Sequence, residues 1–159
     1  MLWVLVAILA FGAISIAVYK AWLLFYPRTA ERATLNPACD LRLSPCTVRF
    51  KSGASVQLDI QPRGIPVMRP LEATVQIDGL PAPRRVELDF AGFDMGMGYN
   101  RVILHPGDQP GAYAGGGMLP ICVRNRMTWQ ARVLLDLPHG ILAAPFRFDT
   151  FRAGGPADG

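Results

Sequence analysis

The residues with the most distinctive chemistry are sulfur-bearing side chains in two glycine-rich segments. Met95 and Met97 lie two residues apart in Gly-Phe-Asp-Met-Gly-Met-Gly-Tyr-Asn. In an extended backbone such a pair projects to one side, and the flanking glycines let the loop bend so that both sulfurs converge. Met118 and Cys122 follow in Gly-Gly-Gly-Met-Leu-Pro-Ile-Cys. Because thioethers and thiolates are soft donors that select Cu(I), these four side chains form a predicted Cu(I) site.

His105 is a further candidate ligand, since imidazole also binds copper. The methionines have two other interpretations. Methionine is a flexible side chain that fills irregular gaps in a core, and Met97 or Met127 would then pack inside the domain. A hydrophobic contact with a partner protein is the third interpretation, and all three remain open at this point.

The three cysteines allow two disulfide pairings. Cys39 and Cys46 lie in Ala-Cys-Asp-Leu-Arg-Leu-Ser-Pro-Cys, a spacing that can close a small loop in an oxidising compartment. Alternatively, Cys46 pairs with Cys122 and leaves Cys39 free. An odd number of cysteines leaves at least one without a partner in the chain, and an inert buried thiol is one role open to Cys122.

The sequence offers little material for catalysis or nucleic-acid binding. Its two histidines, His105 and His139, each lie in a turn that contains proline, and neither is part of a nucleophile–base pattern. We therefore expect no enzymatic activity. The net charge of +4 comes mainly from arginine, in short pairs such as Arg84-Arg85. Nucleic-acid-binding proteins instead carry basic runs with interleaved aromatic residues, so we expect no nucleic-acid partner.

Short strands are the elements that must position these residues. Apolar and polar residues alternate with the period of a strand that has one buried face. Turn residues separate the segments, which are 48–50, 55–60, 73–78, 85–90, 101–104, 128–135 and 144–148.

This pattern predicts an all-β domain over residues 47–152. Its expected fold is an immunoglobulin-like or cupredoxin-like β-sandwich of about seven to eight strands. A mostly polar stalk that contains Pro37 and Pro45 precedes it at 28–46, and a flexible tail follows at 153–159.

Residues 1–27 are predicted to form a single transmembrane helix. Lys20 is the only charged side chain in this segment, and about 25 helical residues cross a hydrocarbon core of ~30 Å. Trp22 and Tyr26 would lie among the lipid headgroups, and Pro27 would end the helix. A cleaved signal peptide is the alternative, but the segment lacks a basic n-region and a clear cleavage site.

Two observations predict opposite orientations in the membrane. Four basic residues follow the uncharged stretch from Leu2 to Val18, namely Lys20, Arg28, Arg32 and Arg42, and the positive-inside rule would keep the domain in the cytoplasm. A disulfide between Cys39 and Cys46 instead requires an oxidising compartment. We expect an inner-membrane protein whose domain lies on the periplasmic side.

The chain between residues 90 and 148 resembles the YtkA-like and FixH-like group of small extracytoplasmic domains. The resemblance rests on Met-x-Met-Gly-Tyr-Asn, on Gly-x-Tyr ending at Tyr113, on Met-Leu-Pro-x-Cys and on Trp129 in the following strand. Members are membrane-anchored or exported immunoglobulin-like sandwiches, often associated with copper handling or with assembly of respiratory haem-copper oxidases. The resemblance implies that Met95 and Met97 are ligands and that Tyr113 and Trp129 belong to the core.

The expected function is therefore a membrane-anchored domain that assists metalloprotein assembly or handles Cu(I). The alternative is an accessory subunit of a membrane complex that binds no metal. Ala13 and Ala17 would then offer a small-residue face for helix packing. Met95 and Met97 would form an adaptable contact surface in that case.

Overall fold

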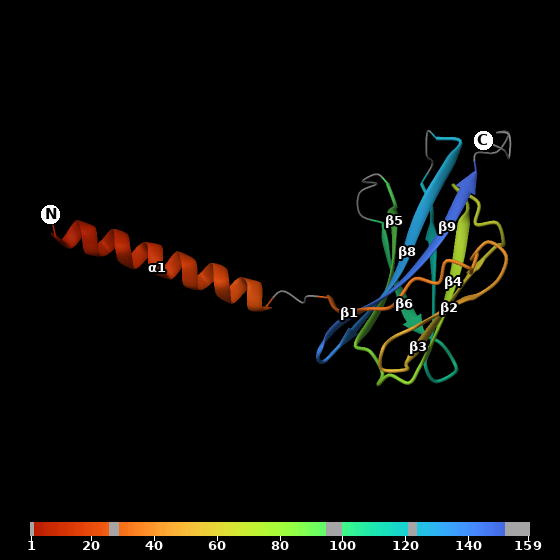
Figure 1. Cartoon of the computed structure of the whole chain (residues 1–159), viewed down its shortest axis with the longest axis horizontal. Helices are drawn as coiled ribbons and strands as arrows, with labels where there is room; N and C mark the ends of the chain where they lie inside the picture. Colours follow the sequence, from red (N-terminus) through yellow and green to blue (C-terminus); the bar gives the residue numbers. More distant parts are fainter. Residues whose placement is uncertain (1, 26–28, 95–99, 121–123, 152–159) are drawn as a thin grey trace.

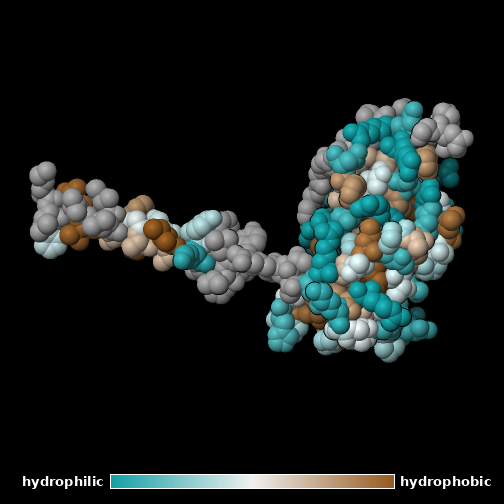
Figure 2. Space-filling model, in the orientation of Figure 1, coloured by the Kyte–Doolittle hydropathy of each residue, from teal (hydrophilic) through white to brown (hydrophobic). Residues whose placement is uncertain are grey.

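A computed structural model of the chain describes residues 2–25, 29–94, 100–120 and 124–151. Helix α1 (Leu2–Phe25) lies apart from a single β domain, as Figure 1 shows. Trp3 and Phe11 are exposed on this helix, and Figure 2 shows hydrophobic residues on its surface. Within the described part of the chain, no helix combines the length with the apolarity that crossing a bilayer requires. The transmembrane anchor therefore stays a prediction.

The β domain is one sheet that curls into a half-barrel (Figure 1). Its neighbouring strands follow the order β1-β9-β8-β5-β6-β7-β4-β3-β2. All pairs are antiparallel except β1 with β9. The strands are β1 (Thr29–Arg32), β2 (Cys46–Arg49), β3 (Ser55–Gln61), β4 (Pro70–Asp78), β5 (Arg85–Gly92), β6 (Arg101–Pro106), β7 (Ala112–Met118), β8 (Arg126–Leu137) and β9 (Gly140–Phe151).

The concave side of the curled sheet encloses the hydrophobic core. Strand β8 alternates buried and half-buried residues along its length, which is the pattern of a strand with one face on a core. Trp129 is fully buried there, and its indole N–H donates a 2.8 Å hydrogen bond to the Thr150 hydroxyl. Phe90 and Phe148 meet edge to face with ring centroids 6.5 Å apart. The prediction of a mostly β domain is confirmed.

The number of strands differs from the predicted seven to eight, because β1 and β7 carry no alternating pattern. Strand β7 reads Ala-Tyr-Ala-Gly-Gly-Gly-Met and pairs with β4 from Pro70 to Gln76. Close packing explains one of its glycines. A Cβ on Gly115 would lie 2.7 Å from a methyl carbon of Leu104 and 2.9 Å from the Ile103 carbonyl oxygen. Glycine lets β6 and β7 approach, but it removes the side chains from which a strand is recognised.

The segment predicted as a stalk, 28–46, differs from that expectation in the part that is described. Strand β1 pairs in parallel with β9, and Ala33 extends this pairing by donating a 2.9 Å hydrogen bond to the Ala143 carbonyl. Leu41 is fully buried in the core. Residues 29–46 are therefore part of the β domain, whose edge they cover.

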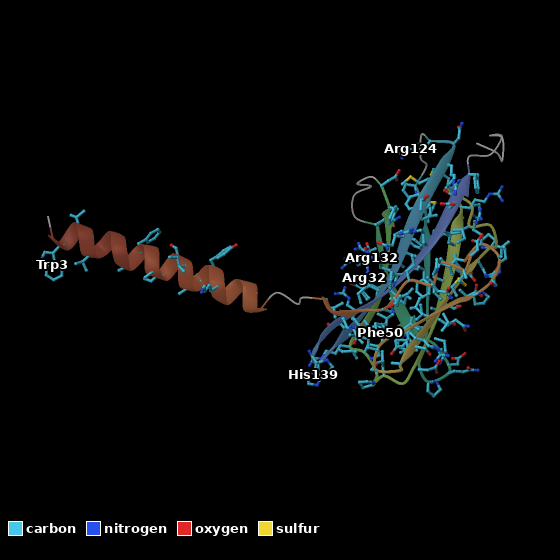
Figure 3. The ribbon with its side chains drawn as sticks, in the orientation of Figure 1. Trp3, Arg32, Phe50, Arg124, Arg132 and His139 are labelled. Atoms are coloured by element: carbon cyan, nitrogen blue, oxygen red, sulfur yellow. A yellow bond between two sulfur atoms is a disulfide. The ribbon has the colours of Figure 1, made fainter. Side chains whose placement is uncertain are left out.

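The strands define two ends of the domain. Strands β3, β5, β7 and β9 finish at one end, which we call the Met end because Met68 and Met118 lie there. Strands β2, β4, β6 and β8 finish at the other, which we call the turn end. Arg124 lies at the Met end and His139 at the turn end, as Figure 3 shows.

Candidate functional site at the Met end

Among the sulfur residues predicted as ligands, Met118 is the one that the structure describes. It is the last residue of β7, it lies opposite Pro70, and 49% of its surface is exposed. Met95, Met97 and Cys122 lie outside the described residues. Met127, in β8, is 2% exposed. Its interpretation as a methionine that packs in the core is confirmed.

The described flanks of the two glycine-rich segments meet at the Met end. Asp94 directly precedes one segment and Arg124 directly follows the other, and their side chains form an ion pair. Asn100 ends the first segment, and its side-chain amide donates a 3.3 Å hydrogen bond to the Met118 carbonyl. Two contacts thus join segments that are well separated along the chain.

The structure does not bring His105 together with Met118. His105 lies near the end of β6, at the turn end, where it pairs with Ala114. Met118 is four residues further along β7, which corresponds to about 13 Å of strand. The proposed imidazole ligand is therefore far from the thioether of Met118.

Met68 is a thioether at the Met end that the sequence reasoning missed. It lies in the connection between β3 and β4, and 56% of its surface is exposed. Its backbone N–H donates a 3.0 Å hydrogen bond to the Leu119 carbonyl, next to Met118. Met68 stands between prolines, distant in sequence from both glycine-rich segments, so only the pairing of β4 with β7 connects it to them.

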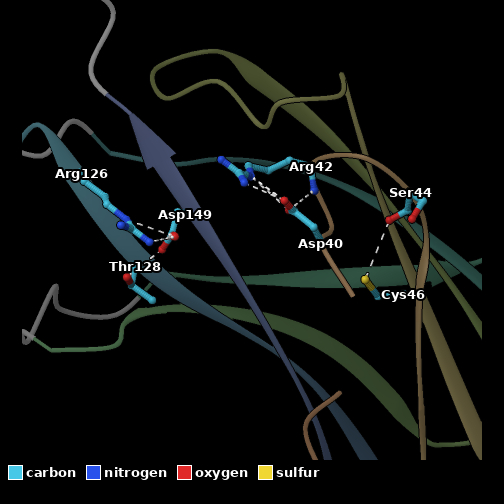
Figure 4. A network of polar contacts seen from close by, with 7 residues as sticks. All are labelled: Asp40, Arg42, Ser44, Cys46, Arg126, Thr128 and Asp149. Carbon is cyan, nitrogen blue, oxygen red and sulfur yellow. Dashed lines mark hydrogen bonds and ion pairs between the residues drawn. The ribbon is translucent and has the colours of Figure 1, made fainter. Parts of the chain in front are cut away.

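A network of arginines and carboxylates covers the same end (Figure 4). The Arg42 guanidinium donates to both carboxylate oxygens of Asp40, at 2.6 Å and 3.0 Å. It also lies over the Phe151 ring, 5.3 Å from the centroid, while Arg126 lies 5.9 Å from the same centroid. Phe151 is 43% exposed between these two cations. The surface thus combines an aromatic ring with two arginines.

The pKa values of two carboxyl groups in this network are lowered. Hydrogen bonding from Arg42 lowers the pKa of Asp40 and outweighs the effect of burial, which raises it. Burial alone would raise the pKa of Asp149, but hydrogen bonds from Thr128 and Arg126, with the charges of Arg126 and Arg42, lower it by more. The hydrogen bond to Asp40 also raises the pKa of Arg42. Both carboxyl groups therefore stay ionised near neutral pH.

A disulfide between Cys39 and Cys46 closes the loop that carries Asp40 and Arg42. It is one of the two pairings that the sequence left open. Between residues 35–42 and β9 lies a cavity of about 250 Å³. Arg147 lines this cavity and stacks over the Phe93 ring, 3.8 Å from the centroid. The disulfide thus holds the loop beside a cationic and aromatic surface.

The described residues offer thioethers as candidate metal ligands. Within the described ranges, no three His, Cys, Asp or Glu side chains come together in a group that could hold a metal ion. Met68 and Met118 are exposed at the Met end and are soft, neutral donors. A metal at this surface would accordingly be a soft one.

Comparison with family models, with curated proteins and with solved structures gives no match to this chain. The resemblance to YtkA-like and FixH-like domains therefore stays a prediction. The arrangement of the Met end is the main basis for a functional assignment.

Proposed function

We propose that this chain is a membrane-anchored, extracytoplasmic β domain that binds Cu(I) through methionine and cysteine sulfur. It would assist the assembly of a metalloprotein, such as a respiratory oxidase, as the sequence resemblance implies. One observation carries the proposal. The ion pair between Asp94 and Arg124 joins the immediate neighbours of the segments that hold Met95, Met97 and Cys122.

The composition of α1 supports the membrane anchor. The helix has 24 residues, with Lys20 as its one charged side chain. At a rise of 1.5 Å per residue, a helix of this length measures about 36 Å, more than the ~30 Å of a hydrocarbon core. Trp3 is 84% exposed and Phe11 is 75% exposed. Lipid would cover these apolar surfaces, so we place the anchor in the inner membrane.

The disulfide and the course of β9 support an extracytoplasmic site that faces away from the bilayer. A disulfide between Cys39 and Cys46 is stable in an oxidising compartment such as the periplasm.

The chain enters the domain at β1, where Thr29 pairs with Ile141. From Ile141 to Phe151, strand β9 extends about 33 Å towards the Met end. Such a distance favours transfer of Cu(I) to an extramembrane part of a partner.

The two halves of the curled sheet support the immunoglobulin-like or cupredoxin-like β-sandwich that we propose as the finer description of the fold. Strand β6 pairs with β5 through residues 101–104 and with β7 through residues 105–106. It therefore links β1-β9-β8-β5 to β7-β4-β3-β2 around one core. A strand shared between two facing sheets is a common way of making the corner of a sandwich.

Anaerobic titration of the full chain with Cu(I) tests the metal-binding part. The chain is kept in detergent, and a colorimetric Cu(I) chelator competes with it. We expect binding tighter than micromolar that weakens at least about tenfold in Met95→Leu/Met97→Leu and in Cys122→Ser, since even the loss of outer-shell partners weakens metal sites by about that factor. Met127→Leu is the matched control, because Met127 is buried. Affinity no better than micromolar in the unmodified chain would contradict the proposal.

A reporter fusion tests the orientation. A reporter that is active only in the cytoplasm, fused after Gly159, should be inactive when the domain is periplasmic. An active fusion would reverse the assignment, because a stable disulfide requires the oxidising side.

An accessory subunit without metal is the second candidate. The exposed rings of Phe93 and Phe151 with their arginines favour it, because aromatic residues and arginine are enriched in protein interfaces. Ala13 and Ala17 of α1 would then pack against a neighbouring helix. Co-purification in mild detergent separates the two candidates. An accessory subunit travels in a fixed ratio with its complex whether or not copper is supplied.

A further inference from the structure

Met68 and Met118 are neighbours across the pairing of β4 with β7. Pro70 lies opposite Met118 in the last described pair of this ladder. Just beyond this pair, the Met68 N–H donates a 3.0 Å hydrogen bond to the carbonyl of Leu119, the residue that follows Met118. This contact holds the backbone of Met68 beside the end of β7. Methionine side chains are long and flexible, so the two thioethers can reach each other there.

Both thioethers lie on the convex, solvent-facing side of the sheet. Met68 is 56% exposed and Met118 is 49% exposed. Next to Met118, Leu119 is buried in the core, and so is Leu71 beside Pro70, the cross-strand partner of Met118. Two large apolar side chains are thus side by side in solvent at the Met end.

The backbone of Met68 has a left-handed conformation, with φ of 57°. Ile65 in the same connection has φ of 46°, but its side chain is fully buried and the burial offsets the strain. The Met68 side chain is exposed, so packing offers no comparable compensation. Strained residues that the core does not require are concentrated at functional sites.

We propose that Met68 and Met118 form a thioether pair that binds Cu(I) on the convex face of the Met end. The inference rests on the proposed function and names a part of its site. Both donors are neutral, so they prefer a soft monovalent cation to a hard divalent one. Neither donor has to lose a proton, in contrast to a cysteine thiol, so Cu(I) binding to the pair is independent of pH between about 6 and 8.

Methionine methyl NMR tests the pair directly. The full chain, labelled with ¹³C at the methionine methyl groups, is held in detergent and titrated anaerobically with Cu(I), and in a parallel arm with Ag(I). We expect the Met68 and Met118 resonances to shift together, equally at pH 6 and at pH 8. The Met127 resonance should stay in place, because Met127 is buried in β8. Its position also reports that each variant is folded.

Single variants supply the assignment and the affinity. Met68→Leu and Met118→Leu keep the size and apolarity of the side chain but remove the sulfur. In each variant, the Cu(I) concentration needed to shift the resonance of the remaining methionine should rise at least about tenfold. Loss of a partner in a metal site weakens binding by about that factor. Met127→Leu should leave both shifts unchanged.

The outcomes separate the pair from the wider proposal. If the chain binds Cu(I) while the Met68 and Met118 resonances stay in place, the pair is excluded and the proposed function stands. If the chain binds neither Cu(I) nor Ag(I), both fail. Shifts that grow between pH 6 and pH 8 would assign the binding to a thiol instead of the thioether pair.

Discussion

The two ends of the β domain solve the problem of reversing the chain in different ways. At the turn end, short connections use glycine wherever the backbone enters the left-handed region, at Gly53, Gly79, Gly111 and Gly140. At the Met end, the same region is occupied by Gly64 and also by Ile65 and Met68, which carry full side chains. The turn end follows local conformational preferences, and the Met end departs from them.

Charge distinguishes the Met end as well. Arg42, Arg124 and Arg126 form ion pairs there, and two of them flank the exposed Phe151 ring. Departures from local sequence rules tend to coincide with functional surfaces, because selection for stability alone would remove them. The comparison favours the Met end over the turn end as the surface for the proposed function.

Gly111→Ala should have the largest effect on stability. Gly111 has φ of 76°, and a Cβ there would lie 2.3 Å from the Ile77 carbonyl oxygen. The Ile77 N–H donates a 2.9 Å hydrogen bond to the Gly111 carbonyl, so the two backbones are held close together. Backbone strain and overpacking together should lower the free energy of unfolding by about 3 kcal/mol or more. Chemical denaturation followed by circular dichroism measures it.

Gly53→Ala is the matched control at the same end. Gly53 has φ of 89°, but a Cβ there meets no atom within 4 Å. Only the conformational penalty remains, about 1–2 kcal/mol. Equal losses in the two variants would show that close packing does not distinguish these turns.

Removal of the disulfide tests how strongly the Met end depends on a covalent link. Cys39→Ala/Cys46→Ala opens a loop with a sequence separation of 7. Loop-closure entropy for such a short loop predicts a loss of about 2.5 kcal/mol in the free energy of unfolding. A reducing agent should destabilise the unmodified chain by a similar amount and should not affect the double variant. Retained stability would mean that packing of Leu41 alone holds this segment.

The accuracy of the sequence-based predictions follows the same division. Alternation in residues 55–60 and 73–78 predicted β3 and β4, because one face of each strand is buried. Strand β7 was missed, since Gly115 serves a close approach that becomes evident only with the folded sheet. Met68 was missed for a related reason. Its proximity to Met118 depends on pairing between distant strands, and no local pattern encodes it.

The pH dependence of stability should expose the carboxylate network of the Met end. The pKa of Asp149 is lower in the folded chain than its ordinary value of about 3.9. A lowered folded-state pKa gives stability that is present above the ordinary value and is lost as the pH falls through the folded-state value. At pH 7, Asp149→Asn should lower the free energy of unfolding by about 1.5 kcal/mol, the lower end of the range for a lost hydrogen bond to a charged group.

The difference between this variant and the unmodified chain should shrink as the pH falls below about 4, because the unfolded chain then takes up a proton at Asp149 before the folded chain does. Thermal unfolding at pH 7, 5, 4 and 3 measures the trend. Asp108→Asn, in an exposed position at the turn end, is the control. A difference that stays constant down to pH 3 would show that ionisation of Asp149 contributes nothing to the folded state.

Met68→Gly should have the smallest effect on stability, and the sign of that effect decides the comparison between the ends. Glycine adopts φ of 57° without steric penalty, while it adds conformational freedom to the unfolded chain. The free energy of unfolding should therefore stay the same or rise by up to about 1 kcal/mol. Ile65→Gly relieves the same kind of strain but removes a fully buried side chain, so it should cost about 2–5 kcal/mol. If Met68→Gly also destabilised the chain by more than about 1 kcal/mol, its side chain would serve the fold. If Met68→Gly is as stable as the unmodified chain but binds Cu(I) more weakly, the methionine at this strained and exposed position serves metal binding through its sulfur.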